Sequence, residues 1–240
     1  MMTDSHDNRS KPHTLKAVDE ELNQLHQSII EMVGLLMYQL EQSMQALHEA
    51  DRELALQVVN RDSRVNLYEK RIDDLVMEML ARHCPVANDL RFIISVSKIA
   101  YELEKIGDEI CLFAHMVSAL FDPDSSDPNP KLLADINKIG GLVKVMLTKL
   151  MLALERRESA QAYLLLQCDR ECETELHEGI KHQLTFILKD ARMIGRAMDI
   201  MQIMKTLERC GEHSRNIAEY LIFMIEGIDI RHRKIGFSLQ

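Results

Sequence analysis

An internal duplication limits the possible folds of this 240-residue chain more than any other feature of its sequence. When the chain is aligned with itself at an offset of 107 residues, glycines and acidic residues match as well as leucines. The matched pairs include Gly34 with Gly141, Leu40 with Leu147, Met44 with Met151, Leu47 with Leu154, Asp51 with Glu158 and Asp62 with Asp169. Further along, the offset falls to 104, and residues 103–108 align with 207–212. Self-similarity at a nearly fixed period indicates two copies of one structural unit.

Each copy contains three long stretches with the apolar spacing of a helix. In the first stretch apolar residues recur every three or four positions, at Leu22, Leu25, Ile29, Met32, Val33, Leu36 and Leu40. Only 9 glycines and 5 prolines interrupt a composition rich in helix formers. We predict helices at about 15–50, 51–83 and 87–121, then at about 131–155, 158–189 and 191–226. Asp51 is the predicted N-cap of the second helix.

A proline-rich loop separates the two copies, because three of the five prolines fall between residues 122 and 130. The sequence therefore predicts an all-α fold of two tandem three-helix bundles, each long enough to close a core. The predicted parts are a disordered N-terminal tail 1–14, a first repeat 15–121, a linker 122–130, a second repeat 131–226 and a C-terminal tail 227–240.

Charge and composition narrow the possible partners and location. The formal net charge of −9 argues against nucleic acid as a partner, because a phosphate backbone repels an acidic protein. The N-terminus lacks the apolar segment of a secretion signal, and the longest apolar runs are too short to span a bilayer. The five cysteines form no C-x-x-C pair, which favours reduced thiols. We therefore expect a soluble, cytoplasmic protein.

Acidic residues recur at helical spacing in both copies. Glu104 and Asp108 lie one turn apart on one helix face, as do Glu208 and Glu212 in the second copy. The companion stripes on the preceding helices contain Asp62, Asn66, Glu69 and Asp73 in the first copy, and Asp169 and Glu173 in the second.

Like charges at this spacing repel one another, so some cation should compensate them. A basic neighbour such as Lys105 or Arg209 is one candidate. A bound metal is another, because carboxylate and amide oxygens suit hard cations such as Mg²⁺, Mn²⁺ or iron. The predicted metal ligands are Glu104, Asp108, Glu208, Glu212, Asp62, Asn66, Asp169 and Glu173. A solvated charged face without metal is the open alternative.

The sequence contains no recognisable catalytic constellation. It has no Gly-rich phosphate loop, no G-x-S-x-G and no H-E-x-x-H. None of the ten histidines follows a glutamate by three residues, so the Glu-x-x-His motifs of ferritin-like di-iron enzymes are missing. We predict a protein that is not an enzyme.

Several stretches resemble the PhoU family. Residues 207–219 are similar to its second-repeat signature, roughly L-E-R-I-[AG]-D-H-x-x-N-I-A-E, and residues 102–109 resemble the first-repeat copy. Residues 82–91 resemble the family segment R-x-x-P-x-A-x-D-L-R, and residues 227–232 resemble the family ending G-x-D-[IV]-R-H. These landmarks occur in the family's order along most of the chain.

The resemblance implies two three-helix bundles and a peripheral regulator of phosphate uptake. PhoU proteins restrain the phosphate-starvation response when phosphate is plentiful, through the ATPase of the phosphate ABC transporter and a sensor histidine kinase, and often act as homodimers. Their E/D-x-x-x-D motifs, implicated in metal binding, map by position onto Glu104 with Asp108 and onto Glu208 with Glu212.

Some positions depart from the family pattern. Glu212 stands where the family usually has Asp, and residues 112–114 replace the expected N-I-A in the first copy. Two alternatives to a regulator therefore remain at this point: a metal-binding helical scaffold or metal store without a signalling role, and a plain helical scaffold.

Overall fold

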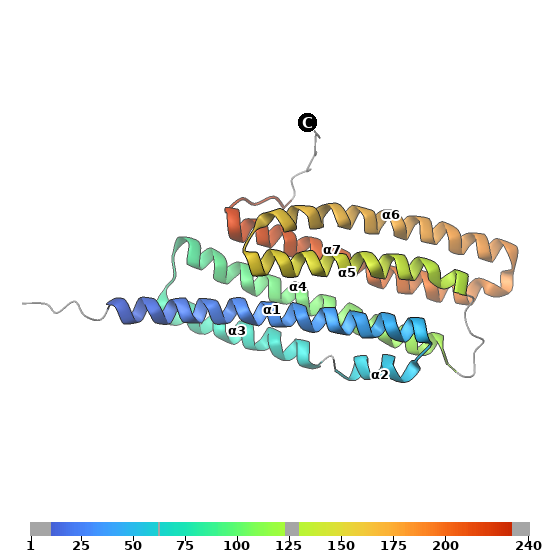
Figure 1. Ribbon diagram of the computed structural model, residues 1–240, viewed down its shortest axis with the longest axis horizontal. Helices are drawn as coiled ribbons and strands as arrows, with labels where there is room; N and C mark the ends of the chain where they lie inside the picture. Colours follow the sequence, from blue (N-terminus) through green and yellow to red (C-terminus); the bar gives the residue numbers. More distant parts are fainter. Residues whose placement is uncertain (1–10, 62, 123–129, 232–240) are drawn as a thin grey trace, which may run out of the picture.

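The structure, a computed structural model, describes residues 11–61, 63–122 and 130–231, and within these ranges every regular element is helical (Figure 1). The elements are α1 (Lys11–Glu49), α2 (Arg52–Asn60), α3 (Ser63–His83), α4 (Ala87–Leu120), α5 (Pro130–Arg156), α6 (Ser159–Lys189), a 3-10 helix η1 (Ala191–Met193) and α7 (Ile194–Glu226). The predicted all-α fold is confirmed. Most of the two predicted tails and of the linker lies outside the described residues.

The second predicted helix, 51–83, is wrong as a single element, because α2 and α3 replace it. Asp51 does cap α2, accepting a hydrogen bond of 2.9 Å from the backbone N–H of Leu54. The helix ends at Arg61, whose N–H turns back to the carbonyls of Val58 and Val59. Valine, asparagine and serine around this point have weak helix propensity, which explains the break. In the second copy α6 is continuous.

Four long helices occupy the middle of the molecule and the others flank them. Figure 1 shows α6 along one edge and α2 with α3 along the other. Between them, α1 packs on α4 and α5, while α7 packs on α4 and α5. The buried side chains of both halves form one continuous hydrophobic core, so the two repeats do not bury separate cores.

Helices α4 and α7 cross in antiparallel orientation and join the two halves through contacts between polar and charged side chains. Nε and one terminal nitrogen, Nη2, of Arg209 donate to the two carboxylate oxygens of Glu109, at 2.7 and 2.6 Å. Near the other side of the crossing, Nδ1 of His213 lies 2.7 Å from the carboxylate of Glu102, whose side chain is largely buried. Bidentate pairing of this kind adds geometric specificity to charge. These contacts fix the register of the two halves.

The same kind of contact, from an arginine of one helix to a backbone carbonyl of the other, occurs at both ends of the crossing. Arg91 on α4 donates to the carbonyl of Met224 on α7, and Arg196 on α7 donates to the carbonyl of Leu120 on α4. Met224 and Leu120 are related by the 104-residue offset, and the two arginines by nearly the same offset. The crossing therefore maps approximately onto itself when the halves are exchanged, as a pseudo-two-fold arrangement.

Candidate functional site

The first acidic cluster lies between α3 and α4. Burial raises the pKa of Glu69 on α3, and the negative charges of Glu104 and Asp73 raise it further. Asp73 in turn accepts a hydrogen bond of 3.3 Å from the hydroxyl of Ser97. Glu69, Asp73, Glu104 and Asp108 together are the first cluster, because the negative charges of the other three all act on Glu69.

A lysine neutralises part of the first cluster. Nζ of Lys105 lies 2.8 Å from a largely buried oxygen of Glu104 and 3.2 Å from Asp108. Hydrogen bonds to these two carboxylates raise the pKa of Lys105, so the ammonium stays charged. The same ammonium also lies 5.4 Å from the ring centre of Tyr101. The first cluster thus contains its own cation.

The second acidic cluster lies between α6 and α7 and consists of Asp169, Glu173, Glu208 and Glu212. Burial raises the pKa of Glu208, and the charges of Glu212 and Asp169 raise it further. Glu173 adds to the same effect. All four predicted ligands of this half are therefore close enough to influence one another.

The cation equivalent to Lys105 does not compensate the second cluster in the same way. Arg209 stands at the equivalent position, but its guanidinium is paired with Glu109 of the other half. A different residue, Arg215, lies 3.3 Å from Asp169. Burial raises the pKa of Asp169, and the Arg215 guanidinium lowers it. Glu173, Glu208 and Glu212 make no ion pair with a basic side chain in the described part of the chain.

The donors of the second cluster fit a hard cation in their chemistry. Among the described residues, however, no three His, Cys, Asp or Glu side chains converge as a set that holds a metal ion. Metal binding would therefore require these carboxylates to rotate toward a common point. In the first cluster Lys105 competes for that point.

The predicted ligands fall into three groups. Asp169, Glu173, Glu208 and Glu212 lie together, and Glu104 and Asp108 share Lys105. Asn66 is exposed on α3, and Asp62 lies outside the described residues. The first cluster instead gains Glu69 and Asp73, which the sequence pattern placed on the stripe but which we did not predict as ligands.

A family comparison identifies the fold and its motifs. A model described as the PhoU domain matches residues 29–117 and 136–221, once in each half. The chain belongs to the PhoU domain family. The resemblance to the family is thereby confirmed, and the matched ranges contain residues 82–91, 102–109 and 207–219.

Curated PhoU proteins align over most of this chain. The Phosphate-specific transport system accessory protein PhoU homolog of Pseudomonas aeruginosa is 34% identical over 220 residues, covering 92% of this chain and 90% of the relative. The PhoU of Escherichia coli is 29% identical over 221 residues, covering 92% and 90%.

Solved PhoU structures share the fold. The crystal structure of PhoU from Pseudomonas aeruginosa superimposes with a TM-score of 0.82 at 33% identity, covering 88% of this chain and 99% of that chain. The phosphate transport system regulatory protein PhoU from Streptococcus pneumoniae gives a TM-score of 0.79 at 25% identity, covering 88% and 98%.

Two PhoU motifs that are far apart in sequence meet in the structure. Gly227, the first residue of the ending motif, terminates α7 with a φ of 74°, in the left-handed region that glycine adopts without strain. A Cβ at this position would collide with the guanidinium of Arg91, the last residue of the motif between α3 and α4. Glycine at this position therefore serves both the helix end and the contact with Arg91.

The length and apolar character of the described helices show whether any of them could cross a membrane. None of them combines the length and apolar character that a bilayer crossing requires.

Proposed function

We propose that this chain is an accessory protein of a phosphate transport system and represses the phosphate-starvation response when phosphate is plentiful. Membership of the PhoU family, whose domain model matches residues 29–117 and 136–221, carries this proposal. Relatives from Pseudomonas aeruginosa and Escherichia coli bear the name of accessory proteins of the phosphate-specific transport system, and each covers 92% of this chain.

The proposed action is contact with two partners, the ATPase of the phosphate ABC transporter and a sensor histidine kinase. A rigid helical body suits such an adaptor, because a docking surface that is already ordered loses little entropy on binding. The continuous core and the side-chain hydrogen bonds of the α4–α7 crossing support this rigidity. In this mechanism the helical surface holds the kinase in its inactive signalling state.

The second acidic cluster is the proposed metal site of this adaptor. Asp169, Glu173, Glu208 and Glu212 would hold a divalent cation such as Mg²⁺ or Mn²⁺, or an iron ion. The bound ion would supply positive charge that removes the repulsion among these carboxylates and ties α6 to α7. Support comes from the raised pKa of Glu208 and from the diversion of Arg209 to Glu109.

Alkaline phosphatase activity in phosphate-rich medium tests the regulatory role. We expect high activity when the gene is deleted in the source organism, and repression when the wild-type gene is restored. Low activity in the deletion strain would contradict the proposal. It would favour a metal-binding scaffold or metal store without a signalling role.

Matched variants then separate the metal from the adaptor. Restoration with Glu208→Gln/Glu212→Gln tests the second cluster, and Glu104→Gln/Asp108→Asn is the control in the first cluster. If metal is required for repression, the first variant should leave phosphatase activity high and the control should repress it. Full repression by both, with equal protein levels on immunoblots, would show that signalling does not need the metal.

The family resemblance also implies a homodimer. Sedimentation velocity should give the mass of two chains at micromolar concentration. A single species of one chain would contradict this part of the proposal.

A further inference from the structure

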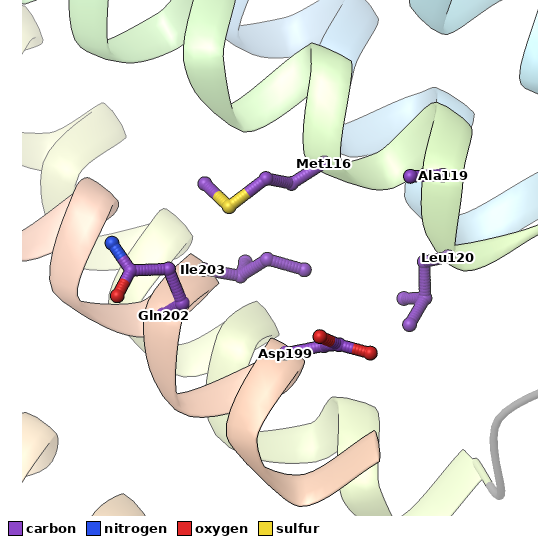
Figure 2. Close-up of a pocket in the computed structure, with 6 residues that line it drawn as sticks. All are labelled: Met116, Ala119, Leu120, Asp199, Gln202 and Ile203. Atoms are coloured by element: carbon purple, nitrogen blue, oxygen red, sulfur yellow. The ribbon is translucent and has the colours of Figure 1, made fainter. Parts of the chain in front are cut away.

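A small cavity opens between the C-terminal end of α4 and the N-terminal part of α7, away from both acidic clusters. Its volume is about 140 Å³, and Figure 2 shows its lining side chains. They are Met116, Ala119, Leu120, Asp199, Gln202 and Ile203. The lining is mostly apolar, with one carboxylate and one amide.

The internal duplication shows which side chains occupy the equivalent place at the other end of the crossing. At the 104-residue offset, Tyr220 is equivalent to Met116 and Phe223 to Ala119. Tyr220 is covered by Lys98, whose Nζ lies 5.3 Å from the ring centre. At this end the smaller residues Met116 and Ala119 line open space instead.

The charged residues beside the cavity differ from those at the other end of the α4–α7 crossing. Lys98, which covers Tyr220, is equivalent to Gln202, so the cavity lacks that cation. The buried Ser95 is equivalent to Asp199, so the cavity has gained a carboxylate. Asp199 is exposed, its side chain makes no hydrogen bond or ion pair within the described ranges, and Figure 2 shows its carboxylate among the lining side chains. The cavity thus lacks both an aromatic ring and a cation.

Exposed apolar side chains precede the cavity residue Gln202 along α7. Ile194 and Met198 lie two turns and one turn before Gln202 on the same side of α7, and they are 53% and 59% exposed. Exposed apolar groups beside a pocket are typical of protein-binding surfaces. A flexible methionine can also adapt its shape to a bound chain.

We propose that this cavity receives a tyrosine or phenylalanine side chain of a partner protein, whose neighbouring lysine or arginine pairs with Asp199. A cavity of about 150 Å³ is large enough for a benzene ring, so the volume suits one aromatic side chain. A cation beside that ring would restore both the ring–cation contact of Tyr220 with Lys98 and the missing partner of Asp199. Aromatic side chains seated in pockets commonly anchor protein interfaces.

The test uses the full chain labelled with ¹³C in its methionine and isoleucine methyl groups. The probes are the capped peptides Ala-Tyr-Arg-Ala and Ala-Ala-Arg-Ala. We expect the first peptide to shift the Met116 and Ile203 methyl signals upfield in a saturable way, because an inserted ring shields nearby methyl groups. The second peptide should leave both signals in place.

Either of two kinds of result would overturn the proposal, a peptide response that does not depend on the ring or a shift without peptide. One is equal shifts with both peptides, or no shift with either at millimolar concentration. The other is an upfield shift that grows with protein concentration without any peptide, because a second copy of the chain would then occupy the cavity.

Two variants sharpen the test. Met116→Tyr/Gln202→Lys rebuilds the pair found at the other end, so the Ile203 methyl should no longer respond to Ala-Tyr-Arg-Ala, and the melting temperature should rise. Asp199→Asn should weaken the binding of Ala-Tyr-Arg-Ala about two- to fivefold, as expected for the loss of an exposed ion pair. It should leave the binding of Ala-Tyr-Ala-Ala unchanged. Undiminished binding to the filled variant would contradict the assignment.

This inference does not depend on metal at the acidic clusters. The peptide titration is read in the isolated protein, whereas the regulatory role is read as phosphatase activity in cells. Failure of one therefore leaves the other intact.

Discussion

The two halves of this PhoU-family chain place equivalent acidic pairs in different electrostatic surroundings. In the first half, Lys105 joins Glu104 to Asp108. In the second half, the equivalent Arg209 pairs with Glu109 across the α4–α7 crossing. One copy of the duplicated unit thus neutralises part of its own cluster with this cation, while the other uses the equivalent cation to join the halves. The equivalent residues Lys105 and Arg209 therefore have different structural roles in the two halves.

The largest expected effect of this difference is on stability. Arg209→Met leaves Glu109, whose side chain is 17% exposed, without its bidentate partner. We expect a loss of about 2–3 kcal/mol in the free energy of unfolding. Lys105→Met should cost less, about 1–2 kcal/mol, because Lys105 makes no bidentate pair with either carboxylate. Asp108 is nearly half exposed and can be solvated, so only Glu104, at 13% exposed, loses a partner in a largely buried position. Urea unfolding followed by circular dichroism measures both. A larger loss for Lys105→Met would reverse the comparison.

The equivalent glycines of α4 and α7 give a second comparison. A Cβ on Gly107 would lie 3.0 Å from a methyl group of Val65, whereas the nearest atom to a Cβ on Gly211 is the sulfur of Cys172, at 3.5 Å. Gly211→Ala should therefore stabilise the helix by about 1 kcal/mol. Gly107→Ala should destabilise the protein by about 1 kcal/mol, because the fully buried, stiff Val65 cannot move easily. Opposite shifts of melting temperature are expected, and shifts of equal sign would contradict the packing difference.

The smallest expected effect concerns pH. The pKa of Glu208 is raised, first by burial, so the folded state binds this proton more tightly than the unfolded state. Glu208→Gln should therefore stabilise the metal-free protein by about 1 kcal/mol or less at neutral pH. The advantage should shrink as pH falls through the folded-state pKa, because the wild-type carboxyl becomes protonated there.

Glu104→Gln is the matched variant for this pH comparison. It should destabilise the protein at neutral pH, because the variant loses the ion pair with Lys105. Thermal melts of both variants between acidic and neutral pH provide the check. A stabilising Glu104→Gln would mean that Lys105 does not compensate the first cluster.

Much of the fold follows from local sequence, and much of the site does not. Helical spacing predicted most helices, and Asp51 was correctly predicted as a cap because capping depends on residues three positions apart. The break at Arg61 was missed because weak helix propensity decides an outcome only together with tertiary packing.

The partners of charged side chains depend on the crossing of α4 and α7. Spacing along each helix placed Glu208 with Glu212 and Asp169 with Glu173, and the structure brings these two predicted pairs together. Helical spacing could not show that Arg209 pairs with Glu109 or that Glu102 contacts His213, because these contacts join residues 100 or more positions apart.

The most direct test of metal binding by the second cluster, and not by the first, is a Mn²⁺ titration by calorimetry. The protein is untagged and is first stripped of metal with a chelator. We expect saturable binding to the wild type and to Glu104→Gln/Asp108→Asn, and none to Glu208→Gln/Glu212→Gln. Lys105→Met should gain a further site, since its first cluster no longer contains a cation. Loss of binding in Glu104→Gln/Asp108→Asn alone, or a wild type that binds no Mn²⁺, would contradict the account.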